Sequence, residues 1–78
     1  MKLPIVSSED VVRVLKRVGF SYAPKRGKGS HLAFYKKDQD RKRLVIIPKR
    51  KAIPKGTLLA ILEQAGLTRE QFLELLRR

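Results

Sequence analysis

His31 is the single histidine of this 78-residue sequence, which contains no cysteine. Histidine is the side chain that most readily exchanges a proton near neutral pH, so it suits general acid–base catalysis. Twelve lysines and arginines lie between Lys25 and Lys55 against two acidic residues, so this window holds +10 of the formal net charge of +12. An imidazole in such a basic segment suits proton transfer on a substrate whose phosphate groups the cations hold.

RNA is a substrate for which one histidine among cations is sufficient. RNA carries its own nucleophile, the 2′-hydroxyl beside the scissile phosphate, so the enzyme has only to move protons and stabilise the charge on the phosphoryl oxygens. This chemistry needs no cofactor, and the scattered acidic residues offer no carboxylate cluster to hold a metal ion. A single histidine also occurs as an ordinary surface or structural residue, and the residue types alone leave both interpretations of His31 open.

Composition and spacing exclude several other kinds of site. One histidine without cysteine cannot form a His/Cys zinc site. Gly27 and Gly29 lack the third glycine and the following helix of a dinucleotide-binding motif, and no P-loop is present. Ser30 beside His31 is not a nucleophile–base pair, because adjacent residues of a strand point to opposite faces.

The clustered positive charge indicates a polyanionic partner, and nucleic acid is the natural one. A solubilising surface is the alternative, but solubility does not require charges of one sign to cluster. Lys49–Lys51 stand before a predicted helix, whose free N-terminal amides would add to their affinity for phosphate. Residues 27–29 either bring backbone close to a phosphate or form a plain hairpin turn. The residues that we expect to contact RNA are Lys25, Arg26, Lys28, Gly29, Ser30, Lys36, Arg43, Lys49, Arg50, Lys51 and Lys55.

Three helices are predicted from capping residues and apolar spacing. The first begins at Ser7 or Ser8, with Ser7 and Asp10 as a capping box, and ends at Gly19. A second begins near Thr57 and ends at Gly66. A short third helix follows Thr68, which forms a capping box with Gln71. The buried stripe of the first helix is Val11, Val14, Leu15 and Val18.

Three strands are predicted at residues 20–26, 30–37 and 44–47, joined by short turns as an antiparallel meander. Alternation along the second strand places Leu32 and Phe34 on one face and His31, Ala33 and Tyr35 on the other. Tyr22 and Tyr35 suit either base stacking or packing within the sheet.

The predicted order is therefore α-β-β-β-α-α, an α+β fold with a three-stranded antiparallel sheet. The length predicts a single domain over residues 1–78. No run of about 18 apolar residues could span a membrane, and the N-terminus has no secretory signal. We therefore expect a cytoplasmic protein.

The sequence resembles the HicA family of toxin–antitoxin modules, in the right order and spacing over nearly the whole chain. The resemblance rests on residues 14–20 (VLKRVGF), 29–34 (GSHLAF), 53–58 (IPKGTL) and 64–67 (QAGL). It implies a double-stranded-RNA-binding-domain-like fold, cleavage of messenger RNA, and a HicB-type antitoxin that blocks the active site. The family histidine corresponds to His31, and the glycine and serine before it to Gly29 and Ser30.

Two features depart from the family pattern. Leu32 follows the motif histidine where members often carry a second histidine or polar residue, and Lys49–Lys51 replace a loop that commonly contains glycine. The resemblance favours a metal-independent endoribonuclease with His31 as its catalytic residue. The alternatives are an RNA-binding module of the same fold without cleavage, and a structural or ribosome-associated protein whose basic face docks on RNA.

Overall fold

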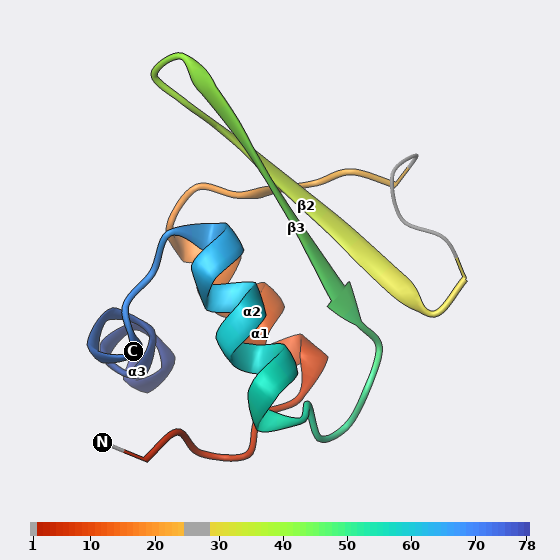
Figure 1. Ribbon diagram of the computed structural model, residues 1–78, viewed down its shortest axis with the longest axis vertical. Coiled ribbons are helices and arrows are strands. Elements are labelled where there is room, and N and C mark those ends of the chain that lie inside the picture. The colour runs from red at the N-terminus through yellow and green to blue at the C-terminus, as the bar shows by residue number, and fades with distance from the viewer. Residues whose placement is uncertain (1, 25–28) are drawn as a thin grey trace.

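The computed structural model describes residues 2–24 and 29–78 of the chain. Its elements follow in the predicted α-β-β-β-α-α order, and the double-stranded-RNA-binding-domain-like α+β fold is confirmed. Figure 1 shows the three helices gathered below the sheet, and the β2–β3 hairpin reaching beyond them. The elements are α1 (Ser8–Arg17), β1 (Ser21–Tyr22), β2 (His31–Asp38), β3 (Arg41–Pro48), α2 (Lys55–Ala65) and α3 (Arg69–Arg77).

Helix α1 begins and ends as its sequence predicts. The Ser7 hydroxyl accepts a hydrogen bond from the Asp10 amide at 3.2 Å, and the Ser7 amide donates to Asp10 Oδ2 at 3.0 Å, which completes the capping box. After α1, Gly19 adopts a φ of +97°, a conformation that L side chains rarely adopt. The amide of Phe20 then bonds back to the carbonyl oxygen of Leu15 at 2.9 Å, so the chain turns sharply toward the sheet.

The sheet has the strand order β1-β2-β3, with both pairs antiparallel. Strand β1 is shorter than predicted because only Ser21 and Tyr22 pair with β2. Strand β3 is longer than predicted, because pairing continues without a break from His31 opposite Pro48 to the end of the hairpin. The turn lies at residues 39–40, where Gln39 has a φ of +54°.

The two C-terminal helices also have defined ends. Helix α2 begins two residues earlier than predicted, after Pro54, and ends at Gly66 with a φ of +73°. At the start of α3, the Thr68 hydroxyl accepts from the Gln71 amide at 3.1 Å and Gln71 Oε1 accepts from the Thr68 amide at 2.8 Å. This confirms the second predicted capping box.

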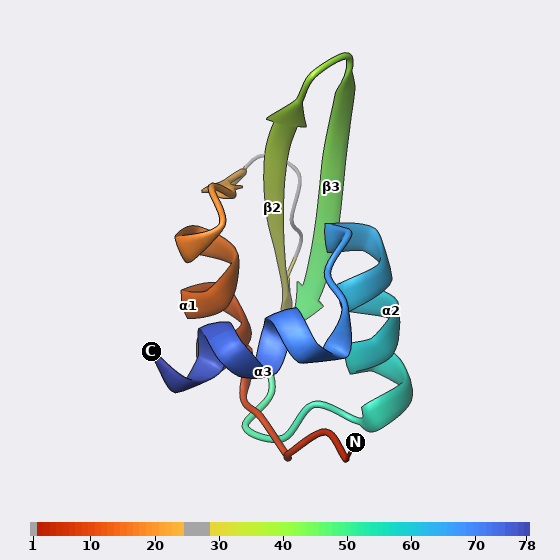
Figure 2. The ribbon, with the colours of Figure 1, turned by 90° about the vertical axis from the view of Figure 1, so that its left-hand side faces the viewer.

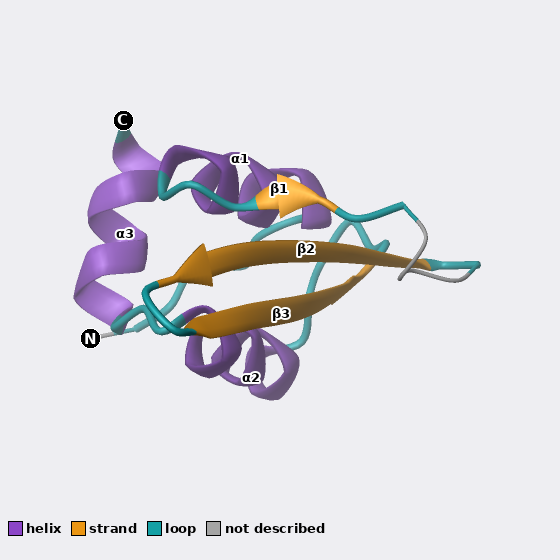
Figure 3. Ribbon diagram, turned by 90° about the horizontal axis from the view of Figure 1, so that it is seen from above, coloured by secondary structure: helices purple, strands orange, loops and turns teal. Residues whose placement is uncertain are grey.

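The core lies on one face of the sheet, between the strands and the helices. Phe34 of β2 and the β3 residues Val45 and Ile47 are buried there against apolar side chains of all three helices. In Figure 2, α1 and α2 lie on either side of the lower half of the hairpin and α3 crosses between them. Figure 3 shows the strands with α1 beside β1 and α2 beside β3. In the described part of the chain, no helix is long and apolar enough to cross a membrane.

The other face of the sheet contributes no side chain to the core cluster. His31, Tyr35 and Leu44 are exposed on it, whereas Ala33 between them is buried. We call this surface the open face.

Candidate active site

His31 is the first residue of β2 and pairs with Pro48, the last residue of β3. Its side chain is exposed, and its neighbours Leu32 and Phe34 face the helices. The predicted alternation is therefore confirmed at this end of the strand. Within the described residues, no side chain hydrogen-bonds the imidazole of His31.

A groove of about 510 Å³ lies beside His31, between the end of the hairpin and α2. Its helical wall is low because Gly56 and Ala60 face it one turn apart, and a Cβ added at Gly56 would meet nothing within 4 Å. The lining residues are His31, Ile46, Pro48, Arg50, Pro54, Gly56, Thr57, Ala60, Ile61 and Gln64. The groove is thus open enough to admit a chain, with the imidazole at one side.

Arg50 is the cation that the fold places in the same groove as His31. Its backbone is tied to the start of α1 by three hydrogen bonds with Ser8. The Ser8 amide and hydroxyl both donate to the Arg50 carbonyl oxygen, at 2.9 and 3.2 Å, and the Ser8 hydroxyl accepts from the Arg50 amide at 3.3 Å. The loop that contains Lys49–Lys51, which we call the basic loop, is therefore fixed at Arg50.

Two further backbone hydrogen bonds hold this loop. The amide of Lys49 donates to the Ser30 carbonyl oxygen at 2.7 Å, and the amide of Ile53 donates to the Val6 carbonyl oxygen at 2.8 Å. Sequence reasoning did not identify Ser8 as a positioning residue. The available signal was the second serine at the start of α1, since capping requires only Ser7.

The N-terminus of α2 forms another part of the groove, through Pro54, Gly56 and Thr57. Pro54 supplies no side-chain cap, and the first turn contains no acidic residue. The partial positive charge of this helix end is therefore not offset from within the helix. Arg50 and the N-terminus of α2 suit the binding of a phosphate group, and the imidazole of His31 would then serve as a proton acceptor beside it.

The structure separates the remaining predicted cations. Lys49 and Lys51 line a neighbouring hollow of about 410 Å³ with Ser7, Ser8, Glu9 and Arg50. Lys55 is exposed at the first position of α2. Gly29, with a φ of +59°, and Ser30 form the exposed turn before His31. Lys25, Arg26 and Lys28 lie outside the described residues.

Lys36 and Arg43 pair with each other across the hairpin, on the face opposite His31. The Lys36 ammonium lies 5.9 Å from the ring centroid of Phe20. Arg43 donates a hydrogen bond to the Gln64 carbonyl oxygen at 3.5 Å, in the last turn of α2, where a cation is favourable. Their predicted contact with RNA stays a prediction, and the fold gives both side chains contacts of their own.

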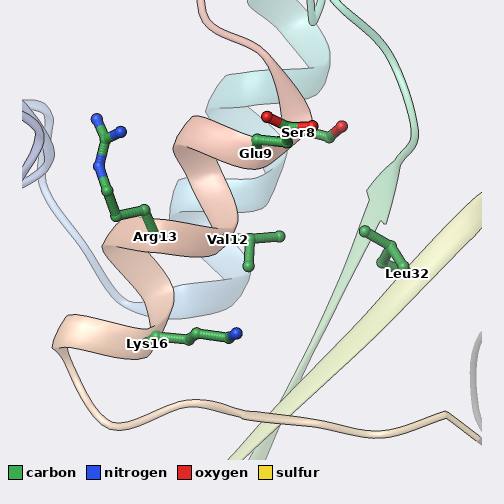
Figure 4. Close-up of a pocket in the computed structure, with 6 residues that line it drawn as sticks. All are labelled: Ser8, Glu9, Val12, Arg13, Lys16 and Leu32. Atoms are coloured by element: carbon green, nitrogen blue, oxygen red, sulfur yellow. The ribbon is translucent and has the colours of Figure 1, made fainter.

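A second cavity, of about 400 Å³, lies between α1 and β2 on the helix-covered side of the sheet. Figure 4 shows Val12 and Leu32 facing each other across it, with Arg13 and Lys16 farther along the helix. Because Leu32 and His31 point to opposite faces of β2, this cavity is separate from the His31 groove. Among the described residues, no three acidic or histidine side chains gather as a metal-binding group.

The family model described as "HicA toxin of bacterial toxin-antitoxin" matches residues 8–67 of the chain. The match runs from the first residue of α1 to just beyond α2, so it includes His31, Arg50 and the groove between them. Helix α3 lies outside it. No curated protein matches the sequence at a significant level.

Proposed function

Because this chain belongs to the HicA family of bacterial toxins, we propose that it is an endoribonuclease that cleaves messenger RNA with His31 and that a HicB-type antitoxin inhibits it. The observation that carries the proposal is the groove that His31 lines together with Arg50 and the N-terminus of α2. Because its proposed substrate is messenger RNA, the protein would act in the cytoplasm. No metal ion or other cofactor takes part in the proposed reaction.

Each part of the groove has a role in this reaction. The imidazole of His31 takes the proton of the 2′-hydroxyl, and the resulting oxygen attacks the adjacent phosphorus. The bond from phosphorus to the 5′ oxygen breaks, that oxygen takes a proton from water, and the protonated imidazole neutralises the hydroxide that this leaves. The products are a 2′,3′-cyclic phosphate and a 5′-hydroxyl end. The Arg50 guanidinium and the α2 amides stabilise the negative charge that grows on the phosphoryl oxygens.

The exposed position of His31 supports this role. An imidazole in the core would be inaccessible to a polymer, whereas His31 stands on the open face beside the groove. The net charge of +12 draws the polyanion to the protein before any specific contact forms.

The decisive experiment is a cleavage time course on three matched strands: an RNA, the DNA of the same sequence, and the RNA with one 2′-deoxy substitution at the cut site. We expect cleavage of the RNA alone, and a 2′,3′-cyclic phosphate at its new end. Equal cleavage of the substituted strand would show that the 2′-hydroxyl is not the nucleophile. Binding of RNA without cleavage of any strand would instead identify a non-catalytic RNA-binding module.

A further inference from the structure

A row of cross-strand residue pairs leads away from His31 on the open face. Four cross-strand pairs of β2 and β3 point to this face, because every second residue of a strand lies on the same side. The pairs, in order from the groove, are His31 with Pro48, Ala33 with Ile46, Tyr35 with Leu44, and Lys37 with Lys42. Successive pairs are roughly 6.6 Å apart, at about 3.3 Å per residue.

Tyr35 and Leu44 are the third pair, and packing does not account for them. Tyr35 is 44% exposed and Leu44 is 40% exposed, and neither belongs to the core cluster or packs against it. With Ala23 and Lys42 they line a shallow hollow of about 300 Å³. In the part of the chain that the structure describes, the Tyr35 hydroxyl has no hydrogen-bond partner.

The other tyrosine of the sheet, Tyr22, is also exposed, at 51%, but it lies on the opposite face. Tyr22 pairs directly with Phe34, and the two ring centroids are 5.5 Å apart with the planes tilted by 45°. Tyr22 therefore packs on an aromatic ring of the core, while Tyr35 presents its ring on the open face. Of the two uses that the sequence left open for these tyrosines, the structure shows packing for Tyr22, and stacking stays open for Tyr35.

Lys37 and Lys42 form the last pair of the row and stand directly opposite each other. Like charges directly opposite each other destabilise a sheet, and a bound anion would offset this repulsion. Across the described residues, neither lysine forms an ion pair. The row thus has an exposed aromatic and aliphatic pair at its centre, two lysines at one end, and His31 with Arg50 at the other.

We propose that this row binds a single-stranded segment of RNA along β2, with Tyr35 stacked on an unpaired base and Lys37 and Lys42 holding a phosphate. The proposal rests on the proposed function, in that His31 marks the end of the row where cleavage occurs. Tyr35 lies about 13 Å from His31 along the strand, four residues at roughly 3.3 Å each, so the stacked base is not the one at the cut site. A base in a duplex has no free face for the ring, so the row selects unpaired RNA.

Single-stranded RNA fits this surface better than a protein does. Cations at both ends of an apolar patch complement a chain that offers a phosphate at every step and a flat base between phosphates. Every base has a stacking face, so the row confers preference for unpaired RNA without strong preference for sequence.

The two tyrosines and the lack of tryptophan make a direct test possible. In a His31→Ala, Tyr22→Phe protein, which leaves the RNA intact, Tyr35 is the only tyrosine and supplies the intrinsic fluorescence. We expect a 12-nucleotide single-stranded RNA to quench this emission as it binds, and the same RNA annealed to its complement to quench it far less. A matched His31→Ala, Tyr35→Phe protein, whose emission comes from Tyr22, should show little quenching.

Affinity gives the second measurement, in the His31→Ala background with a fluorescein-labelled RNA. Tyr35→Ala should weaken single-strand binding by about tenfold, as the loss of one stacked base predicts, while Tyr35→Phe retains most of the affinity. Tyr22→Ala is the matched control and should leave affinity nearly unchanged once folding is verified. Lys37→Ala with Lys42→Ala should make binding less dependent on salt.

Unchanged affinity of the Tyr35→Ala protein, or duplex binding as tight as single-strand binding, would overturn the proposal and assign this face to another partner. The outcome is separable from that of the proposed function because no cleavage is needed. If the wild-type protein cuts no RNA but Tyr35→Ala still weakens RNA binding, the proposal for the row stands and the catalytic role of His31 is wrong. If the protein cuts RNA and Tyr35→Ala does not change binding, the catalytic role of His31 stands and the proposal for the row is wrong.

Discussion

The hydroxyl of Ser8 donates a hydrogen bond to the carbonyl oxygen of Arg50 at 3.2 Å and accepts one from the amide of Arg50 at 3.3 Å. These residues are 42 positions apart in the sequence. The side chain of Ser8 is thus built into the backbone of the basic loop, and it joins the start of α1 to the groove that contains His31. Ser8 is 9% exposed, so water competes weakly for these bonds.

Ser8→Ala should therefore reduce RNA cleavage, although Ser8 acts through Arg50 and not by contact with the substrate. The change leaves the part-buried Arg50 amide without its partner, and we expect a loss of about 1 kcal/mol in the free energy of unfolding. Cleavage should fall further than this loss explains, because Arg50 is no longer held beside His31. Ser8→Thr, which keeps the hydroxyl, should recover part of the activity. Thermal melts and single-turnover rates test both effects, and an unchanged rate would contradict the positioning role.

Arg50→Ala should lower the rate of cleavage by roughly a hundredfold, as expected for one donor to a developing oxyanion. The matched control is Arg77→Ala, which removes the same charge from an exposed position on α3. Long-range attraction to RNA falls by one charge in both variants, so their difference isolates the role of Arg50 in the groove. Equal rates in the two variants would show that Arg50 contributes only long-range attraction to RNA and has no specific role in the groove.

His31→Ala should abolish measurable cleavage and leave the fold and RNA affinity nearly intact. The side chain is exposed on the open face and contributes nothing to the core. The loss of a general base lowers rates by about 10²–10⁴. Circular dichroism, melting temperature and RNA affinity should match the wild type. Retained cleavage would rule out a catalytic role for this histidine, and unfolding of the variant would contradict the prediction that the fold does not need it.

Gly56 offers a test of the groove itself, since a side chain at this position meets only open space. Gly56→Ala should fold as well as the wild type or slightly better, because alanine has the higher helix propensity. Gly56→Glu should place a carboxylate at the phosphate end of the groove and strongly reduce cleavage. Single-turnover rates and melting temperatures separate the two effects. If both variants cut RNA at the wild-type rate, the groove is not the site of cleavage.

Asp10 should make the stability of α1 depend on acid pH. The hydrogen bond from the Ser7 backbone amide, helped by the Ser7 hydroxyl and by Arg13, holds the pKa of Asp10 below its ordinary value of 3.8 although desolvation opposes this. A carboxyl with a lowered pKa stabilises the fold above its unfolded pKa, and this contribution is lost as pH falls through the folded value. Asp10→Asn should therefore be less stable than the wild type at pH 7, and the difference should shrink below about pH 4. Melts from pH 7 to pH 2.5 test this, and a constant difference would contradict it.

The antitoxin should be acidic where it contacts this chain, and should cover His31 together with Lys25, Lys28 and Lys49. Opposite charges favour this complex, and the bound toxin should melt at a higher temperature than the free one. Co-expression with a HicB-family protein, followed by mass-spectrometric footprinting of the lysines, tests this contact. Protection confined to α3, with His31 left open, would contradict the blocking model.

Local sequence patterns determined much of the fold. Ser7 with Asp10 and Thr68 with Gln71 form capping boxes because each motif completes itself within one turn of helix. Gly19 and Gly66 adopt positive φ values where helices were predicted to stop. The alternation in β2 placed His31 off the core, since the strand period follows from backbone geometry alone.

The tertiary structure decided which cations accompany His31. Arg50 lies in the His31 groove because Ser8 binds its backbone from 42 residues away, while Lys36 rests over Phe20 and Arg43 reaches the end of α2. The sequence alone does not say on which surface a lysine or arginine lies, because strand pairing and helix packing decide this. The length of β1 was decided in the same way, since a strand extends only as far as its neighbour pairs with it. Residue types therefore determined the chemistry open to this protein, and contacts between distant segments determined where that chemistry assembles.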